Sequence, residues 1–240
     1  GQLILEDGSH FNGIKIGSPK MGIGEVCFNT SMTGYQEIIT DPSYAGQIIN
    51  FTFPHIGNVG TNLEDDESRK PFVKGIIINC DISDPSNYRS ILHLDAWLKK
   101  NNVPGICNID TRQITNRIRS KGAPKGGIIE GPINNKKTAL CLKEIKKWRG
   151  LNGLDLAIEV SRKDIKIYRS KNKSNLKVVA VDYGIKENIL NCLLDLNLEV
   201  ILVPAKTSAE QILRYNPNGV FLSNGPGDPK ATGKYAVPII

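Results

Sequence analysis

The chain has 240 residues and a formal net charge of +7, with 40% apolar and 23% charged residues. This composition is typical of a folded protein rather than a disordered one, and the length accommodates two domains. No apolar run approaches the ~20 residues that a membrane helix needs, and no secretory signal is visible, so we expect a cytoplasmic protein without membrane contact.

Basic residues gather in two segments. Residues 116–147 hold nine Lys and Arg against two acids, and residues 161–177 hold seven against one. A nucleic-acid surface is expected to interleave such residues with stacking aromatics, which are sparse in both segments. We therefore favour solvated helix faces, a basic linker or a docking surface for an acidic partner, and we expect no nucleic acid as a partner.

The five cysteines are widely spaced and form no C-x-x-C pair: Cys27, Cys80, Cys107, Cys141 and Cys192. An odd number with these spacings argues against a disulfide framework and against a thiolate zinc site. We expect reduced, mostly buried thiols. The three histidines lie far apart in the sequence, so no metal site is predicted.

The first 150 residues predict a mixed α and β domain. Residues 3–6 and 9–16 predict a β-hairpin, because Asp7-Gly8 between them supplies a turn with positive φ. Further strands are expected at 25–29, 47–53 and 72–80. Helices with one apolar face are expected at 90–100, 110–120 and 138–148.

The remaining residues predict a different architecture. Residues 151–176, rich in Lys, Arg, Ser and Asn, predict a linker, although Ile165 and Ile167 leave a short edge strand open. Beyond them the pattern is β-α-β-α-β, with strands at 177–182, 199–203 and 219–222 and helices at 185–196 and 208–215. Nearly continuous apolar strands are typical of a parallel sheet covered by helices on both faces.

Two local predictions complete this second region. Thr207 and Glu210 have the spacing of a capping box at the start of the second helix. Residues 236–240 predict the opening of a fourth strand, and we therefore expect the domain at 177–240 to be incomplete.

The segment 223–229 (SNGPGDP), which we call the Gly-loop, follows the third strand. Two glycines around a proline allow positive φ and a close approach to a ligand, and the proline holds that shape. Backbone N–H groups in such a loop can point at one developing negative charge, as in an oxyanion hole. A tight turn without function explains the same residues equally well.

The Gly-loop resembles the glycine-rich loop of class I glutamine amidotransferases, and residues 181–188 (VDYGIKEN) resemble the opening of that domain in the carbamoyl-phosphate synthetase small-subunit family. Motifs of the first region look like the same family in the same order, at 5–8 (LEDG), 24–26 (GEV) with 28–37 (FNTSMTGYQE), 40–44 (TDPSY), 54–62 (PHIGNVGTN) and 109–112 (IDTR). The resemblance covers essentially the whole chain.

The resemblance implies an α/β protein with the family's N-terminal domain at 1–150, a linker at 151–176 and the start of a flavodoxin-like amidotransferase domain at 177–240. In this family the small subunit hydrolyses L-glutamine and passes ammonia to a large subunit. The large subunit makes carbamoyl phosphate from bicarbonate and ATP, so ATP and Mg are expected there and no cofactor on this chain. A heterodimer with the large subunit is implied, whereas a role in arginine or pyrimidine biosynthesis is left open.

The resemblance also implies which residues contact glutamine: Ser43, Gly225 and Gly227. Gly225 would donate its N–H to the oxyanion, and Ser43 would reach the substrate from the first domain. From the residues alone, Ser43 is equally well explained as a cap or turn residue after Pro42. Residues 182–184, at a strand end, are a further candidate for lining the same cleft.

The family's nucleophile elbow, G-x-C-x-G-x-Q, does not occur in these residues. We therefore expect the nucleophilic Cys and its His and Glu partners to lie beyond residue 240, and the 240-residue chain to be inactive as a glutaminase. The missing nucleophile also leaves open a non-catalytic module that only docks on the large subunit. A basic nucleic-acid binder is the weakest alternative.

Overall fold

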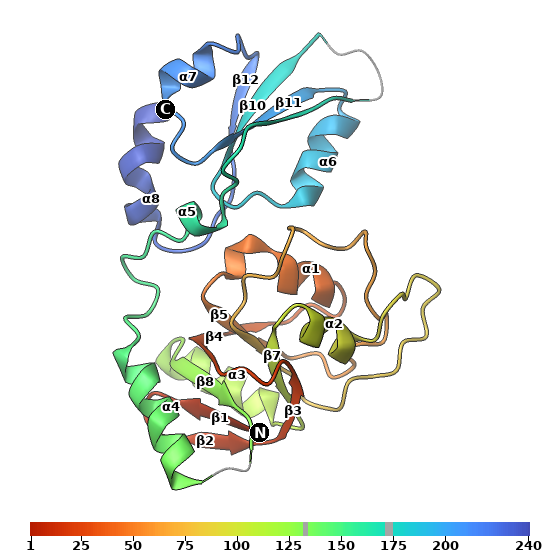
Figure 1. Ribbon diagram of the computed structural model, residues 1–240, viewed down its shortest axis with the longest axis vertical. Helices are drawn as coiled ribbons and strands as arrows, with labels where there is room; N and C mark the ends of the chain where they lie inside the picture. Colours follow the sequence, from red (N-terminus) through yellow and green to blue (C-terminus); the bar gives the residue numbers. More distant parts are fainter. Residues whose placement is uncertain (132–133, 171–174) are drawn as a thin grey trace. The chain divides into compact units, whose positions relative to one another are not determined.

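The computed structural model describes residues 1–131, 134–170 and 175–240, which form two units with a sheet in each (Figure 1). The first unit comprises Gly1–Thr40 and Gly46–Gly150. The second comprises Asp41–Ala45 and Leu151–Ile240. The short segment Asp41–Ala45 therefore belongs to the second unit, although its neighbours in sequence belong to the first.

The first unit contains an eight-stranded mixed sheet in the order β2-β1-β8-β4-β5-β6-β7-β3. Its strands are β1 (Gln2–Leu5), β2 (His10–Asn12), β3 (Ile14–Gly17), β4 (Gly22–Asn29), β5 (Gln47–Phe51), β6 (Gly75–Ile77), β7 (Pro104–Cys107) and β8 (Lys125–Ile129). The run from β4 to β7 is parallel, and β8 pairs antiparallel with both β1 and β4. Its helices are α1 (Tyr35–Thr40), α2 (Leu94–Lys100), α3 (Thr111–Lys121) and α4 (Asn135–Lys147).

Helices α3 and α4 pack against opposite faces of the first sheet. Successive side chains of a strand point to opposite faces. Leu3 of β1 therefore shares a buried cluster with Ile114 of α3. The next residue, Ile4, packs with Cys141 and Ile145 of α4. The prediction of a mixed α and β first region is thus confirmed.

The second unit contains a four-stranded sheet in the order β12-β10-β11-β9. Its strands are β9 (Lys166–Tyr168), β10 (Lys177–Asp182), β11 (Glu199–Pro204) and β12 (Gly219–Leu222), and its α-helices are α5 (Ala157–Val160), α6 (Glu187–Asp195), α7 (Ala209–Leu213) and α8 (Pro229–Ala236). Strand β10 is parallel to β11 and β12, whereas β9 is antiparallel to β11.

Both faces of this sheet are covered, as the sequence predicted. Val179 and Val181 of β10 pack with Ile212 of α7 on one face. Ala180, between them in sequence, packs with Leu190 of α6 on the other. Figure 1 shows α6 on one side of the sheet and α7 with α8 on the other. An α/β unit with three parallel strands is confirmed.

Two predictions for the first unit need correction. The second arm of the hairpin ends at Asn12, and the following strand β3 pairs with β7 at the opposite edge of the sheet. Gly13 permits this change because a Cβ there would collide with the Cys107 carbonyl. Helix α2 begins at Leu94 rather than at residue 90, so Ile91 lies outside it and is 67% exposed.

In the second unit, residues 236–240 form no strand. Asp228 caps α8 by accepting a hydrogen bond from the Lys230 N–H at 2.8 Å, and Pro229 occupies the first turn. Both features start a helix, and the 3₁₀ turn Val237–Ile239 follows directly. The expected fourth strand is therefore wrong.

The capping box of α7 also differs from the prediction. It is formed by Ser208 and Gln211, while the Thr207 hydroxyl donates to the Pro204 carbonyl at 2.7 Å. For the segment 151–176, the sequence left a linker and a short edge strand open. The structure has the helix α5 and the edge strand β9 there. Residues 171–174 of that segment lie outside the described residues.

Candidate functional site

The order of the strands in the second sheet indicates where a ligand binds. From the central β10 the chain passes through α6 to β11 on one side, and then through α7 back to β12 on the other. The connections thus diverge between β10 and β12. In open α/β sheets, ligands bind at the carboxyl ends of the strands where the connections diverge. Residues 182–184 and the Gly-loop follow those two strands.

Asp182, the last residue of β10, holds the turn that follows. The residue is only 2% exposed. One oxygen accepts hydrogen bonds from the N–H groups of Gly184 at 2.9 Å and Ile185 at 3.0 Å, and the other accepts from the Arg162 N–H at 2.8 Å. A buried carboxylate needs such donors to offset its desolvation. Its hydrogen bonds among the described residues all come from backbone N–H groups, so Asp182 holds the backbone of this turn.

The turn after β10 and the Gly-loop pack against each other through their backbones. The Tyr183 N–H donates to the Ser223 hydroxyl at 2.9 Å. Gly184 has a φ of +124°, and a Cβ there would lie 3.0 Å from Pro226 Cδ. A Cβ on Gly225 would collide with the Tyr183 carbonyl. Gly225 is therefore required by close backbone approach, and Gly184 by its positive φ.

The Gly-loop presents free backbone donors. Gly227 has a φ of +86°, and Asp228 next to it accepts from the Gly153 N–H at 3.0 Å as well as capping α8. Within the part of the chain that the structure describes, the N–H groups of Gly225 and Gly227 donate to no other atom of the protein. They are available to a ligand, as an oxyanion-binding loop requires.

A cavity of about 300 Å³ adjoins the loop. Its lining includes Gly225, Gly227, Thr232 and Tyr183. Tyr183 is 5% exposed, its hydroxyl has no hydrogen-bond partner among the described residues, and burial raises its pKa. Ser43 is not among the residues that line this cavity.

Ser43 lies next to the Gly-loop without lining that cavity. It belongs to the 3₁₀ turn Pro42–Tyr44, which Asp41 caps by accepting the Ser43 N–H at 2.8 Å. The Ser43 hydroxyl accepts a hydrogen bond from the side-chain Nδ2 of Asn224 at 2.8 Å, and Asn224 directly precedes Gly225. The structure therefore brings Ser43 together with the loop, as part of the second unit and not of the first.

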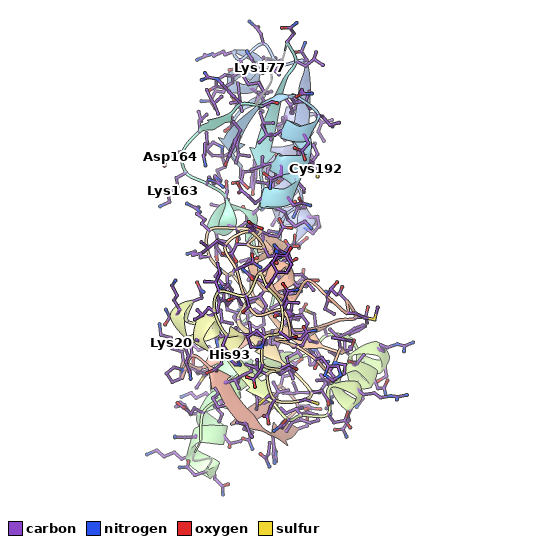
Figure 2. All side chains as sticks on the ribbon, turned by 90° about the vertical axis from the view of Figure 1, so that its right-hand side faces the viewer. Lys20, His93, Lys163, Asp164, Lys177 and Cys192 are labelled. Atoms are coloured by element: carbon purple, nitrogen blue, oxygen red, sulfur yellow. The ribbon has the colours of Figure 1, made fainter. Side chains whose placement is uncertain are left out.

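The thiols differ from the expectation of mostly buried cysteines. Cys107 and Cys141 are buried, Cys27 is half-buried, and Cys80 and Cys192 are exposed; Figure 2 shows Cys192 on α6. Burial raises the pKa of Cys27 and of Cys107 to about 12, and that of Cys141 to about 11. A nucleophilic thiolate needs a lowered pKa, so burial disfavours the reactive form of these three thiols.

Metal-binding and membrane-spanning features are not found in the described ranges. Among residues 1–131, 134–170 and 175–240, no three His, Cys, Asp or Glu side chains are grouped to hold a metal ion. In the same residues, no helix has the length and apolar character needed to cross a membrane.

Two family models match the chain. Residues 3–128 match the family described as carbamoyl-phosphate synthase small chain, CPSase domain, and this match covers more than half of the chain. The chain belongs to the carbamoyl-phosphate synthase small chain family. Residues 179–239 match glutamine amidotransferase class-I. The parallel strands of the second unit fit the flavodoxin-like fold of that class.

Relatives in this family align over nearly the whole chain. Carbamoyl phosphate synthase small chains from Bradyrhizobium diazoefficiens and Agrobacterium fabrum are each 50% identical over 99% of the chain. The small chain from Vibrio parahaemolyticus is 48% identical over 95% of it. The aligned region is 64% of the first two relatives and 63% of the third. The chain thus spans somewhat less than two thirds of their length.

Two residues of the site were not identified from the sequence. Asn224 lies within the Gly-loop, where an amide between Ser223 and Gly225 was a visible polar signal. Arg162 contributes only its backbone N–H to Asp182, a role that any residue except proline can fill. No sequence signal marks such a donor.

Proposed function

We propose that this chain forms part of the glutamine site of a carbamoyl-phosphate synthase small subunit, with Ser43, Gly225 and Gly227 as glutamine contacts. The observation that carries the proposal is the hydrogen bond that joins Ser43 to the Gly-loop through Asn224, at the carboxyl ends of β10 and β12. This bond places the Ser43 hydroxyl beside the loop that carries the two free backbone N–H groups, which supports the proposal that all three contact one ligand.

The chemistry follows from what these groups donate. When a nucleophile attacks the carboxamide of glutamine, negative charge develops on its oxygen. The Gly225 N–H stabilises that charge without reorganisation, because the proline and the packing against Tyr183 already fix the loop. Ser43 and the Gly227 N–H hold the rest of the substrate.

The nucleophile comes from outside these 240 residues in this proposal. Cys27, Cys107 and Cys141 are held as neutral thiols by burial. Of the exposed cysteines, Cys80 follows β6 in the first unit and Cys192 lies within α6, so neither follows β10 or β12. A thiolate with a histidine and a glutamate would complete the hydrolysis. The same facts favour a second candidate, a module that docks on the large subunit without using glutamine.

The product and the partner belong to the same proposal. Ammonia released from glutamine passes to a large subunit, which makes carbamoyl phosphate from bicarbonate and ATP. ATP and Mg bind there and not on this chain. The proposed location of this reaction is the cytoplasm.

The test uses the full-length small chain in complex with its large chain. Ser43→Ala should raise the KM for glutamine about tenfold, the effect of one lost hydrogen bond. Synthesis from free ammonia should be unchanged, because it bypasses the glutamine site. Ser120→Ala, an exposed hydroxyl near the end of α3, is the matched control. A complex that uses only ammonia would support the docking module, and an unchanged glutamine KM in Ser43→Ala would contradict the proposed contact.

A further inference from the structure

Asn224 connects three segments at the site. Its side-chain Nδ2 donates to the Ser43 hydroxyl at 2.8 Å and to the Gly184 carbonyl at 3.1 Å. The two partners come from the 3₁₀ turn Pro42–Tyr44 and from the turn after β10, and Asn224 itself belongs to the Gly-loop. Both protons of the amide nitrogen are thereby used.

The direction of these hydrogen bonds is fixed by chemistry. A backbone carbonyl only accepts, so the amide atom that faces the Gly184 oxygen must be the nitrogen. The same nitrogen then faces the Ser43 oxygen. Ser43 is therefore an acceptor in its contact with Asn224, and its own O–H proton stays free for another partner.

Ser43 is held from both its backbone and its side chain. Asp41 accepts the Ser43 N–H at 2.8 Å, and Lys186 Nζ lies 4.0 Å from the other Asp41 oxygen. Asn224 holds the hydroxyl oxygen. With these contacts in place, the hydroxyl proton is the group of Ser43 that can still bind a ligand.

The other end of the Asn224 amide is unsatisfied. Its Oδ1 is buried and has no hydrogen-bond partner among the described residues. Leaving a buried acceptor unpaired costs stability, and such groups call for a specific explanation. Packing alone does not explain why an amide occupies this position. A requirement for the Nδ2 donor of that amide does explain it.

We infer that Asn224 is a positioning residue that holds the Ser43 hydroxyl as a hydrogen-bond donor toward an oxygen of glutamine. The inference rests on the proposed function, and it adds a residue that acts on the substrate through Ser43. Asn224 fixes the direction of the Ser43 proton, and the ligand oxygen accepts it.

The test is Asn224→Asp in the complex of full-length small chain and large chain. The introduced carboxylate has the shape of the amide but no proton to donate, so the Ser43 proton turns toward it. The KM for glutamine should rise about tenfold while the rate with free ammonia stays within about twofold. Protonation of the new carboxyl restores a donor, so the ratio of mutant to wild-type KM should shrink as the pH is lowered toward 5.

A double-mutant cycle separates positioning from general damage. In a Ser43→Ala background, Asn224→Asp should change the KM by less than about twofold, since the group that it positions is gone. Asn224→Ala provides the same cycle without a new charge if Asn224→Asp does not fold. Asn218→Ala is the control, because Asn218 accepts the Lys177 N–H at the opposite end of β10; its glutamine KM should equal that of wild type.

The outcomes distinguish this inference from the proposed function. If Ser43→Ala raises the KM and Asn224→Asp does not, or if the two effects add fully, Asn224 has no positioning role and the glutamine site stands. If Ser43→Ala itself has no effect on the KM, the proposed contact of Ser43 with glutamine is wrong.

Discussion

The Asp182 carboxylate accepts a hydrogen bond from the Arg162 N–H at 2.8 Å. This bond ties the end of β10 to the segment between α5 and β9. The other carboxylate oxygen accepts the N–H groups of Gly184 and Ile185. One buried side chain thus fixes the turn against which the Gly-loop packs.

Asp182→Asn should destabilise the second unit by about 1–3 kcal/mol, the cost of an unpaired buried donor. One carboxylate oxygen becomes an NH₂ group, which then faces a backbone N–H that has lost its acceptor. Urea unfolding followed through the second unit measures the change. Asp195→Asn, at the exposed end of α6, is the matched control. Equal unfolding midpoints for the two variants would show that the Asp182 contacts are dispensable.

In the complex of full-length small chain and large chain, Gly225→Ala should lower stability by about 1–3 kcal/mol and abolish the proposed glutamine-dependent activity, because overpacking forces the backbone to move. The new Cβ collides with the Tyr183 carbonyl, so the loop shifts and the Gly225 N–H changes direction. Gly219→Ala in β12 is the control. The nearest atom to a Cβ there, Val178 Cγ2, is 3.9 Å away. The unfolding temperature and the glutaminase rate of Gly219→Ala should be close to those of wild type. Wild-type values for Gly225→Ala as well would contradict the steric argument.

The rate of alkylation should be higher for exposed thiols than for buried ones. In the native protein at pH 8, iodoacetamide should modify Cys80 and Cys192 first, since both are exposed. Cys107, with its pKa raised to about 12, and Cys141, raised to about 11, should react slowly, because the thiolate is the reactive form. Peptide mass spectrometry over time follows the reaction, and denatured protein serves as the control. Labelling of native Cys141 as fast as Cys192 would overturn this ranking.

Asp95 should make the first unit sensitive to acid. Burial acts to raise the pKa of Asp95, but the hydrogen bonds from Lys99 Nζ at 2.6 Å and the Gly17 N–H at 2.7 Å outweigh it and lower the pKa. The native carboxylate thus binds fewer protons than the unfolded one. Its contribution is present above the unfolded pKa of about 4 and is lost as the pH falls through the lower native value.

The variant Asp95→Asn isolates this contribution. It should be less stable than wild type by about 1 kcal/mol at pH 7, and the gap should shrink as the pH falls below the unfolded pKa of about 4 and through the lower native pKa. Urea unfolding at pH 7 and at a series of pH values below about 4 measures the gap. Asp84→Asn is the control, because the Asp84 side chain is fully exposed. A gap that does not depend on pH would mean that the charge of Asp95 is not what stabilises the contact.

The strands of the second unit were predicted closely, and the first unit less so. Apolar runs with clear ends placed β10 and β12 at their observed residues. Asp110 and Gly122 marked the ends of α3. The hairpin prediction assigned β3 to the wrong neighbour, because a period-two pattern identifies a strand and not its partner.

The sequence by itself determined several local features of the chain: the two ends of α3, the apolar strands of the second unit and the Gly-Pro-Gly bend. These depend on residues a few positions apart. The tertiary structure alone decided that Ser43 meets Asn224, 181 residues further along, and that Asp182 finds Arg162. Such contacts depend on which strands pair and on where the connections between them diverge. The local periodicity of the sequence does not determine the pairing of the strands.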